Sequence, residues 1–124
     1  CASEDVGNAD PQALVLAVSA SLAVERVGMP EAQIILTQAA CYIATAKKSN
    51  AAVKAIFAAN EVVRKKGNLE IPSYLRDAHY SGHEMLGRGI GYKYPHDYPG
   101  HFVEQQYLPD EIKDFRFYEE DFKK

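Results

Sequence analysis

Tryptophan is absent from this sequence, and cysteine and methionine occur only twice each in 124 residues. The two cysteines, Cys1 and Cys41, are too far apart in the sequence to form a metal-binding or redox motif, and so few cysteines are not typical of a disulfide-stabilised secreted domain. We therefore expect a reducing, cytoplasmic environment. Cys41 lies within an apolar helical pattern, which favours a buried free thiol.

Long apolar runs and a strong excess of one charge are also missing. No apolar stretch approaches the ~20 residues of a membrane-spanning helix. The net charge of −3 argues against a protein that coats DNA by electrostatic attraction alone. Because the sequence has neither a Gly-Lys-Ser/Thr phosphate-binding loop nor a nucleophile elbow, we expect this chain to have no ATPase or hydrolase activity, and no catalytic residue, cofactor or metal of its own.

Alanine is abundant, and its placement predicts helices. The chain has 17 alanines, and all except Ala78 precede residue 60. Asp10 is a capping residue at the start of the first helical pattern, and Gly28 ends that pattern. Gly67 ends the third helical pattern. Hydrophobic periodicity and these capping signals predict three helices, over residues 11–27, 30–46 (opening at Pro30) and 49–66 (capped by Ser49 or Asn50). Their connections are short, so neighbouring helices should run roughly antiparallel.

The second half of the chain has a different pattern. Residues 71–90 predict a shorter helix, weakened by Gly82 and ended by Gly87. Residues 91–124 hold aromatic and proline residues at a spacing that excludes a continuous helix or a paired central strand, apart from a short turn at Pro109–Asp110–Glu111. We expect an irregular packed segment that covers the helices as a structural clamp. Its tyrosine rings should be mostly buried, and His96 and Asp97 should be hydrogen-bonded in a turn. The residues of this clamp are Tyr92, Tyr94, Pro95, His96, Asp97, Tyr98 and Tyr107.

The same stretch resembles a known family. GYKYPHDYPG (residues 91–100), followed by VEQQYLPDE (residues 103–111), is similar to the C-terminal region of the replication-associated recombination protein A family (RarA, or MgsA) of AAA+ ATPases, whose eukaryotic relative is the Werner helicase-interacting protein. The resemblance continues upstream through IPSYLRDAHYSG, ATAKKSNAA and ASEDVGNADPQAL, and covers nearly the whole chain in order. His101, where a second glycine is expected after Gly100, and the acidic C-terminal tail depart from the pattern.

The resemblance implies an all-α fold, with a helical bundle like the clamp-loader collar followed by an irregular aromatic and proline-rich C-terminal segment. The length of 124 residues predicts a single domain. The resemblance implies that residues 1–124 are the C-terminal fragment of a longer AAA+ ATPase, whose ATP and Mg bind in a core outside this chain. The domain is then expected to form a homo-oligomer, a tetramer, in a protein of DNA replication, recombination and repair at stalled forks. The implied partners are DNA ends and single-strand DNA-binding protein, and the implied location is the cytoplasm, at the nucleoid.

Other hypotheses rest on the residues alone. Two basic clusters suit a DNA contact, although compensation of helix C-terminal charge also explains them; they are Lys47 and Lys48, and Arg64, Lys65 and Lys66. His79 and His83 have the i, i+4 spacing of a zinc site on a helix, but no further ligand lies nearby in the sequence. The glycines at 87, 89 and 91 indicate a phosphate-binding loop only weakly, because neither a preceding strand nor a P-loop lysine accompanies them.

Overall fold

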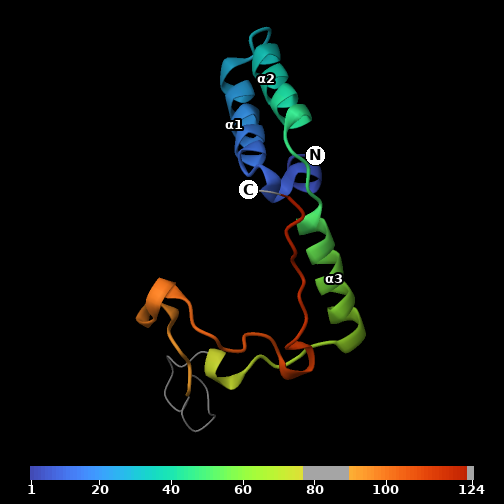
Figure 1. The fold of residues 1–124 in the computed structure, drawn as a ribbon. Helices are drawn as coiled ribbons and strands as arrows, with labels where there is room; N and C mark the ends of the chain where they lie inside the picture. The colour runs from blue at the N-terminus through green and yellow to red at the C-terminus, as the bar shows by residue number, and fades with distance from the viewer. Residues whose placement is uncertain (77–89, 123–124) are drawn as a thin grey trace. The chain divides into compact units, whose positions relative to one another are not determined.

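The structure is a computed structural model, and it describes residues 1–76 and 90–122 (Figure 1). Across these two ranges the regular elements are helical and no β-strand occurs, which confirms the predicted all-α fold. The chain divides into two compact units, one formed by Cys1–Val62 with Arg116–Lys124 and the other by Val63–Phe115. The single-domain organisation stays a prediction. None of the helices described is long and apolar enough to cross a membrane.

The first unit is built on two helices that lie side by side and antiparallel, α1 (Gln12–Val27) and α2 (Ala32–Thr45) (Figure 1). The carboxylate Oδ1 of Asp10 accepts a hydrogen bond from the backbone N–H of Gln12 at 3.1 Å and so caps α1. Gly28 ends α1 at a φ of 75°, where a residue with a Cβ would be strained. The predicted bounds of both helices are confirmed to within two residues.

Alanines form the contact between α1 and α2. The hydroxyl of Tyr42 near the end of α2 donates a hydrogen bond to Asp10 Oδ2 at 2.8 Å, which joins the end of α2 to a residue just before α1. Each of the two helices has two buried residues, and all four are alanines. Because a methyl group occupies little space, the two helices approach closely along this seam. The four seam residues are Ala13 and Ala20 on α1 and Ala32 and Ala39 on α2.

The third helix, α3 (Ala51–Lys66), begins after a fixed linker. Ser49 Oγ accepts a hydrogen bond from the backbone N–H of Ala51 at 3.2 Å, as predicted for one of the two candidate caps. Ala46 is extended, and the Ser49 backbone N–H donates to the Asp5 carbonyl at 2.8 Å. The linker therefore leads α3 away from α2. The prediction that all three helices are antiparallel neighbours is wrong for α3, which does not pack along α2.

Both terminal segments belong to the first unit. The N-terminal turns η1 (Ala2–Val6) and η2 (Gly7–Ala9) precede α1, and Val6 is fully buried. The C-terminal segment returns to them, with Asn8 Nδ2 donating to the hydroxyl of Tyr118 at 3.2 Å and Ser49 Oγ donating to Asp121 Oδ1. Ser49 thus joins the start of α3 to the acidic tail, a contact that sequence reasoning did not anticipate.

The second unit contains four short 3₁₀ turns among its described residues: η3 (Ser73–Leu75), η4 (Pro95–Asp97), η5 (Pro99–His101) and η6 (Asp110–Ile112). The turn predicted after Pro109 is confirmed by η6. Of the helix predicted over 71–90, the structure describes only η3, after which Arg76 is extended. Residues 77–89, and with them His79, His83 and the glycines at 87 and 89, lie outside the described part.

Candidate functional site

The prediction that the tyrosines of the aromatic segment, residues 91–109, are buried is wrong. Tyr92, Tyr94, Tyr98 and Tyr107 expose 44%, 52%, 38% and 48% of their surface, and Phe102 exposes 71%. Local turns order this segment instead: Tyr98 N–H donates to the Pro95 carbonyl at 3.1 Å, and two prolines restrict the path. These rings are therefore partly exposed, and packing of the segment over the helices as a clamp stays a prediction.

Two neighbouring glutamines brace the aromatic segment. Gln105 pairs with the backbone of Lys93, since its Oε1 accepts from the Lys93 N–H at 3.2 Å and its Nε2 donates to the Lys93 carbonyl at 2.7 Å. Gln106 Nε2 donates to the Leu108 carbonyl at 2.8 Å and to Asp110 Oδ1 at 2.6 Å. The backbone carbonyl of Gln106 also accepts a hydrogen bond from the hydroxyl of Tyr74. Sequence reasoning missed these roles, although the consecutive glutamines in VEQQYLPDE were visible.

Within the turns, His96 does form a hydrogen bond, as predicted, but its partner is His101. Their Nδ1 atoms are 3.1 Å apart, and the ring of Tyr94 lies beside His96 with the centroids 5.1 Å apart. The Asp97 backbone N–H donates to the Tyr94 carbonyl at 3.0 Å, which closes η4. A pair of imidazole rings on the surface is therefore a feature that the sequence spacing alone did not reveal.

One of the two basic clusters lies in the linker before α3, and the other forms the last turn of α3. The ammonium group of Lys48 donates to the carbonyl oxygens of Ile43 at 2.8 Å and Ala46 at 2.6 Å, so it compensates the C-terminal end of α2. Lys47 is exposed beside it, and Arg64, Lys65 and Lys66 form the last turn of α3 with exposed side chains. Lys47 and Lys48 belong to the first unit, and Arg64, Lys65 and Lys66 belong to the second. Contact with DNA stays a prediction.

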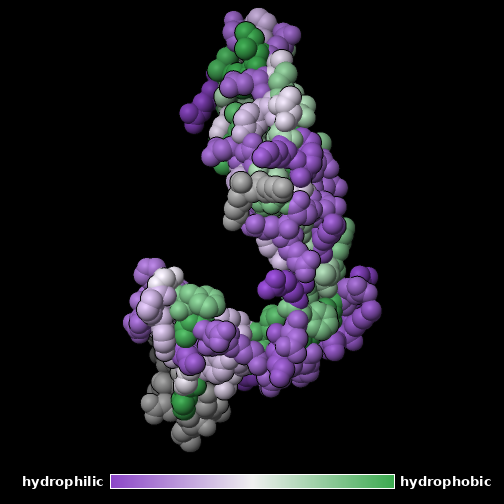
Figure 2. Space-filling view, viewed as in Figure 1, coloured by the Kyte–Doolittle hydropathy of each residue, from purple (hydrophilic) through white to green (hydrophobic). Residues whose placement is uncertain are grey.

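The outer face of α1 carries a stripe of apolar side chains. Leu14, Val18 and Leu22 are four residues apart, and they expose 50%, 52% and 54% of their surface. At 100° per residue they lie on the side of α1 opposite the alanine seam. Figure 2 shows apolar surface in green on the helical hairpin, between polar areas in purple. A helix that is apolar on both faces is normally covered on both.

α2 lines a cavity, and it carries a tyrosine whose pKa is raised. A cavity of about 820 Å³ is lined by Ala40, Ile43 and Ala44 of α2, and also by Cys1, Asp5, Lys48, Ser49, Asn50 and Asp121. The hydrogen bond to Asp10, together with desolvation and the Asp10 charge, raises the pKa of the Tyr42 phenol above its ordinary value of 10.0. Cys41, predicted to be buried, is exposed, because the seam alanines occupy the buried face of α2.

The whole chain matches a known protein family. The model of the family described as MgsA AAA+ ATPase C terminal matches residues 1–124. The chain belongs to this family. It is 51% identical over 118 residues to an uncharacterized AAA domain-containing protein of Mycobacterium tuberculosis, and 47% identical over 117 residues to replication-associated recombination protein A of Bacillus subtilis; each alignment covers 94% of this chain.

A eukaryotic member of the family is similar over the same range. ATPase WRNIP1 of Dictyostelium discoideum is 40% identical over 119 residues, which is 95% of this chain and 14% of that protein. The alignments cover 26% and 28% of the mycobacterial and Bacillus proteins, so the chain spans about a quarter of these relatives. The resemblance recognised in the sequence is thereby confirmed. The region corresponds to the C-terminal domain of AAA+ proteins.

Proposed function

We propose that this domain is the oligomerisation domain of a RarA/MgsA-like AAA+ ATPase, and that it joins subunits through the outer face of α1. The observation that carries the proposal is the stripe of Leu14, Val18 and Leu22, half exposed on the side of α1 that α2 does not cover. The alanine seam supports it, because burial of small side chains on the inner face leaves the larger apolar ones outside.

The geometry of the stripe favours a second copy of this chain as the partner. Leu14 and Leu22 are placed symmetrically about Val18 along one helix face. If two copies of α1 pack antiparallel about a two-fold axis at Val18, Leu14 of each copy meets Leu22 of the other, which is the self-complementary contact of an isologous interface. An unrelated partner would not require this symmetry.

Burial of the stripe would favour association. Full burial of a valine or leucine side chain contributes about 1.5–3 kcal/mol, so covering a half-exposed one contributes about 1 kcal/mol. Three such side chains from each of two copies give roughly 6 kcal/mol before the entropy of association is subtracted. A second apolar area on α3, where Ile56 exposes 54% and Phe57 67%, offers the additional interface that a tetramer with two kinds of two-fold contact needs.

Light scattering coupled to size-exclusion chromatography tests this proposal on the purified chain over a range of concentrations. We expect a tetramer for the wild type, and dimers or monomers for Val18→Glu, because a carboxylate at the centre of the interface would be buried without a partner. Ser19→Glu is the matched control, since Ser19 is exposed on the same helix but lies off the stripe, and it should stay tetrameric. Circular dichroism must show equal helicity for both variants. A monomeric wild type at high concentration, or equal masses for the two variants, would refute the proposal.

The wider role follows from the family. The names of the bacterial relatives place them in replication-associated recombination, and we propose that the full-length protein acts at stalled replication forks in the cytoplasm, with DNA ends and single-strand DNA-binding protein as partners. ATP and Mg would bind outside this chain, because the sequence has no phosphate-binding loop and the part of the chain that the structure describes holds no group of three or more metal-ligating side chains. The measurement that tests this division is ATP turnover, which we expect to be absent for the chain alone and present for the full-length protein.

A second candidate role is nucleic-acid binding by the same domain. The last turn of α3 supports it, since the side chains of Arg64 and Lys66 are exposed there. Anisotropy titrations of labelled single-stranded DNA at several salt concentrations test it, because removing one phosphate-binding side chain should reduce the salt slope by about 0.7. Arg64→Ala with Lys66→Ala should weaken binding, and Lys48→Ala should not, because Lys48 is bound to α2 carbonyls. Unchanged affinity of the double variant would exclude this site.

A further inference from the structure

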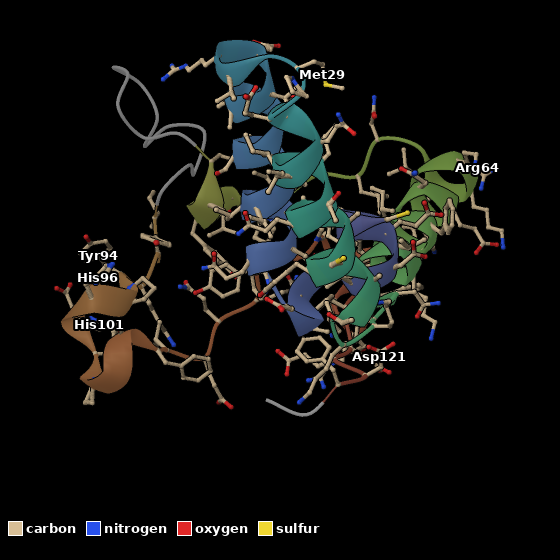
Figure 3. All side chains as sticks on the ribbon, turned by 90° about the horizontal axis from the view of Figure 1, so that it is seen from above. Met29, Arg64, Tyr94, His96, His101 and Asp121 are labelled. Atoms are coloured by element: carbon tan, nitrogen blue, oxygen red, sulfur yellow. The ribbon has the colours of Figure 1, made fainter. Side chains whose placement is uncertain are left out.

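Two histidine side chains lie close together in the second unit, on the adjacent short turns where Figure 3 labels them. The turns η4 and η5 place His96 and His101 so that their Nδ1 atoms are 3.1 Å apart and their ring centroids 4.8 Å apart. Both residues are solvent-accessible. Each neutral imidazole has one nitrogen lone pair, so two nitrogens that face each other at this distance share either a proton or a cation.

The backbone at His101 is unusual in a way that concerns this pair. Its φ is 57°, and among residues 1–76 and 90–122 it is the one residue other than glycine with a positive φ. Gly100 before it also has a positive φ, of 69°. Two consecutive residues in this conformation turn the chain sharply back within η5. A side chain held on strained backbone is a reason to ask what that side chain does.

We propose that His96 and His101 bind a divalent late first-row transition metal ion, such as Zn²⁺, through their Nδ1 atoms. Imidazole nitrogen is a preferred ligand for zinc, copper and nickel. Zn–N distances of 2.0–2.1 Å with a tetrahedral angle require two ligand nitrogens about 3.3 Å apart, so a shift of a few tenths of an ångström suffices. The described residues hold no group of three or more ligating side chains. The ion therefore keeps open positions for water.

Isothermal titration of the full chain with zinc chloride tests the site. We expect one zinc ion per chain for the wild type. His101→Gly should weaken zinc binding by roughly tenfold or more, because loss of a ligand should cost at least as much as loss of a group that only orients one. Glycine adopts a positive φ without strain, so His101→Gly should remain folded, and its melting temperature provides the check. His96→Gln should give the same loss of affinity by removing the other ligand.

A double variant and a spectroscopic measurement identify the site. The chain has four histidines, and the other two are His79 and His83. His79→Gln with His83→Gln should leave zinc affinity unchanged. In ¹⁵N spectra of the histidine rings, zinc should move the Nδ1 signals of both His96 and His101 to the range of metal-bound imidazole nitrogen, and Nε2 of both rings should carry the proton. Loss of binding in the double variant, wild-type affinity in His101→Gly, or zinc-bound Nε2 with protonated Nδ1 would each overturn the proposal.

Discussion

Replacing Asp10 by alanine tests how α1 is fixed to α2. Asp10 uses both carboxylate oxygens: Oδ1 accepts from the backbone N–H of Gln12 at 3.1 Å, and Oδ2 accepts from the hydroxyl of Tyr42 at 2.8 Å. The first contact caps α1, and the second joins the start of α1 to the end of α2. One substitution therefore removes a local contact and a cross-helix contact together.

The loss of the cap dominates the expected effect of Asp10→Ala. Removal of such a cap costs about 1 kcal/mol of folding free energy. The hydrogen bond from the exposed Tyr42 competes with water and adds little. For a chain of this size, a loss of about 1 kcal/mol lowers the melting temperature by roughly 4 °C. Asp10→Asn keeps a side-chain oxygen for the Gln12 N–H but loses the negative charge near the helix N-terminus, so it should cost less than half as much.

Thermal unfolding followed by circular dichroism distinguishes the two variants. All proteins must be measured at one concentration, because self-association would make the melting temperature depend on it. Tyr42→Phe serves as the matched control, since it removes the cross-helix hydrogen bond and leaves the cap. We expect Asp10→Ala to melt lowest and Tyr42→Phe to melt near the wild type. Equal melting temperatures for Asp10→Ala and Asp10→Asn would show that the cap does not hold α1, and the reasoning would be refuted.

Three further outcomes are expected. Because the phenol pKa of Tyr42 is raised in the folded chain, the stabilising contribution of this phenol is present below pH 10 and is lost as the pH rises through the folded value. Ultraviolet titration of the tyrosines at 295 nm, compared between wild type and Asp10→Asn, measures the raised pKa. Identical tyrosine titrations for the two proteins would contradict it. Ala20→Leu should destabilise the first unit by about 1–3 kcal/mol by separating the helices at the seam, whereas Ser21→Leu on the exposed side should not; chemical denaturation compares them, and equal midpoints would argue against the seam. Gln105→Ala should lower the stability of the second unit by about 1 kcal/mol and speed hydrogen exchange at the Lys93 N–H that it leaves unpaired; unchanged exchange would show that the brace is not formed in solution.

Local signals in the sequence were sufficient to predict the helices of the first half. The cap at Asp10 and the stop at Gly28 act within a few residues, so they give the bounds of α1 without knowledge of the rest of the fold. The same holds for the turn after Pro109. The family was also recognisable from the sequence, because ordered blocks of residues spread along the chain carry it.

The wrong predictions concern contacts between distant residues. Burial of Tyr94 and Cys41 was predicted from ring size and helical pattern, but burial depends on what lies opposite, and both are exposed. Antiparallel packing of α3 was predicted from a short linker. The structure instead anchors that linker at Ser49 to Asp5, and so directs α3 away from α2.

The sequence by itself determined the all-α class, the bounds of α1, α2 and α3 and the family, because periodicity, capping and short motifs depend on neighbouring residues. Only the tertiary structure decided which apolar faces are covered and which side chains meet. The alanine seam leaves the outer stripe of α1 open, and two adjacent turns bring Nδ1 of His96 to within 3.1 Å of Nδ1 of His101. Pairing of this kind depends on the path of the backbone in three dimensions, and sequence spacing does not specify that path.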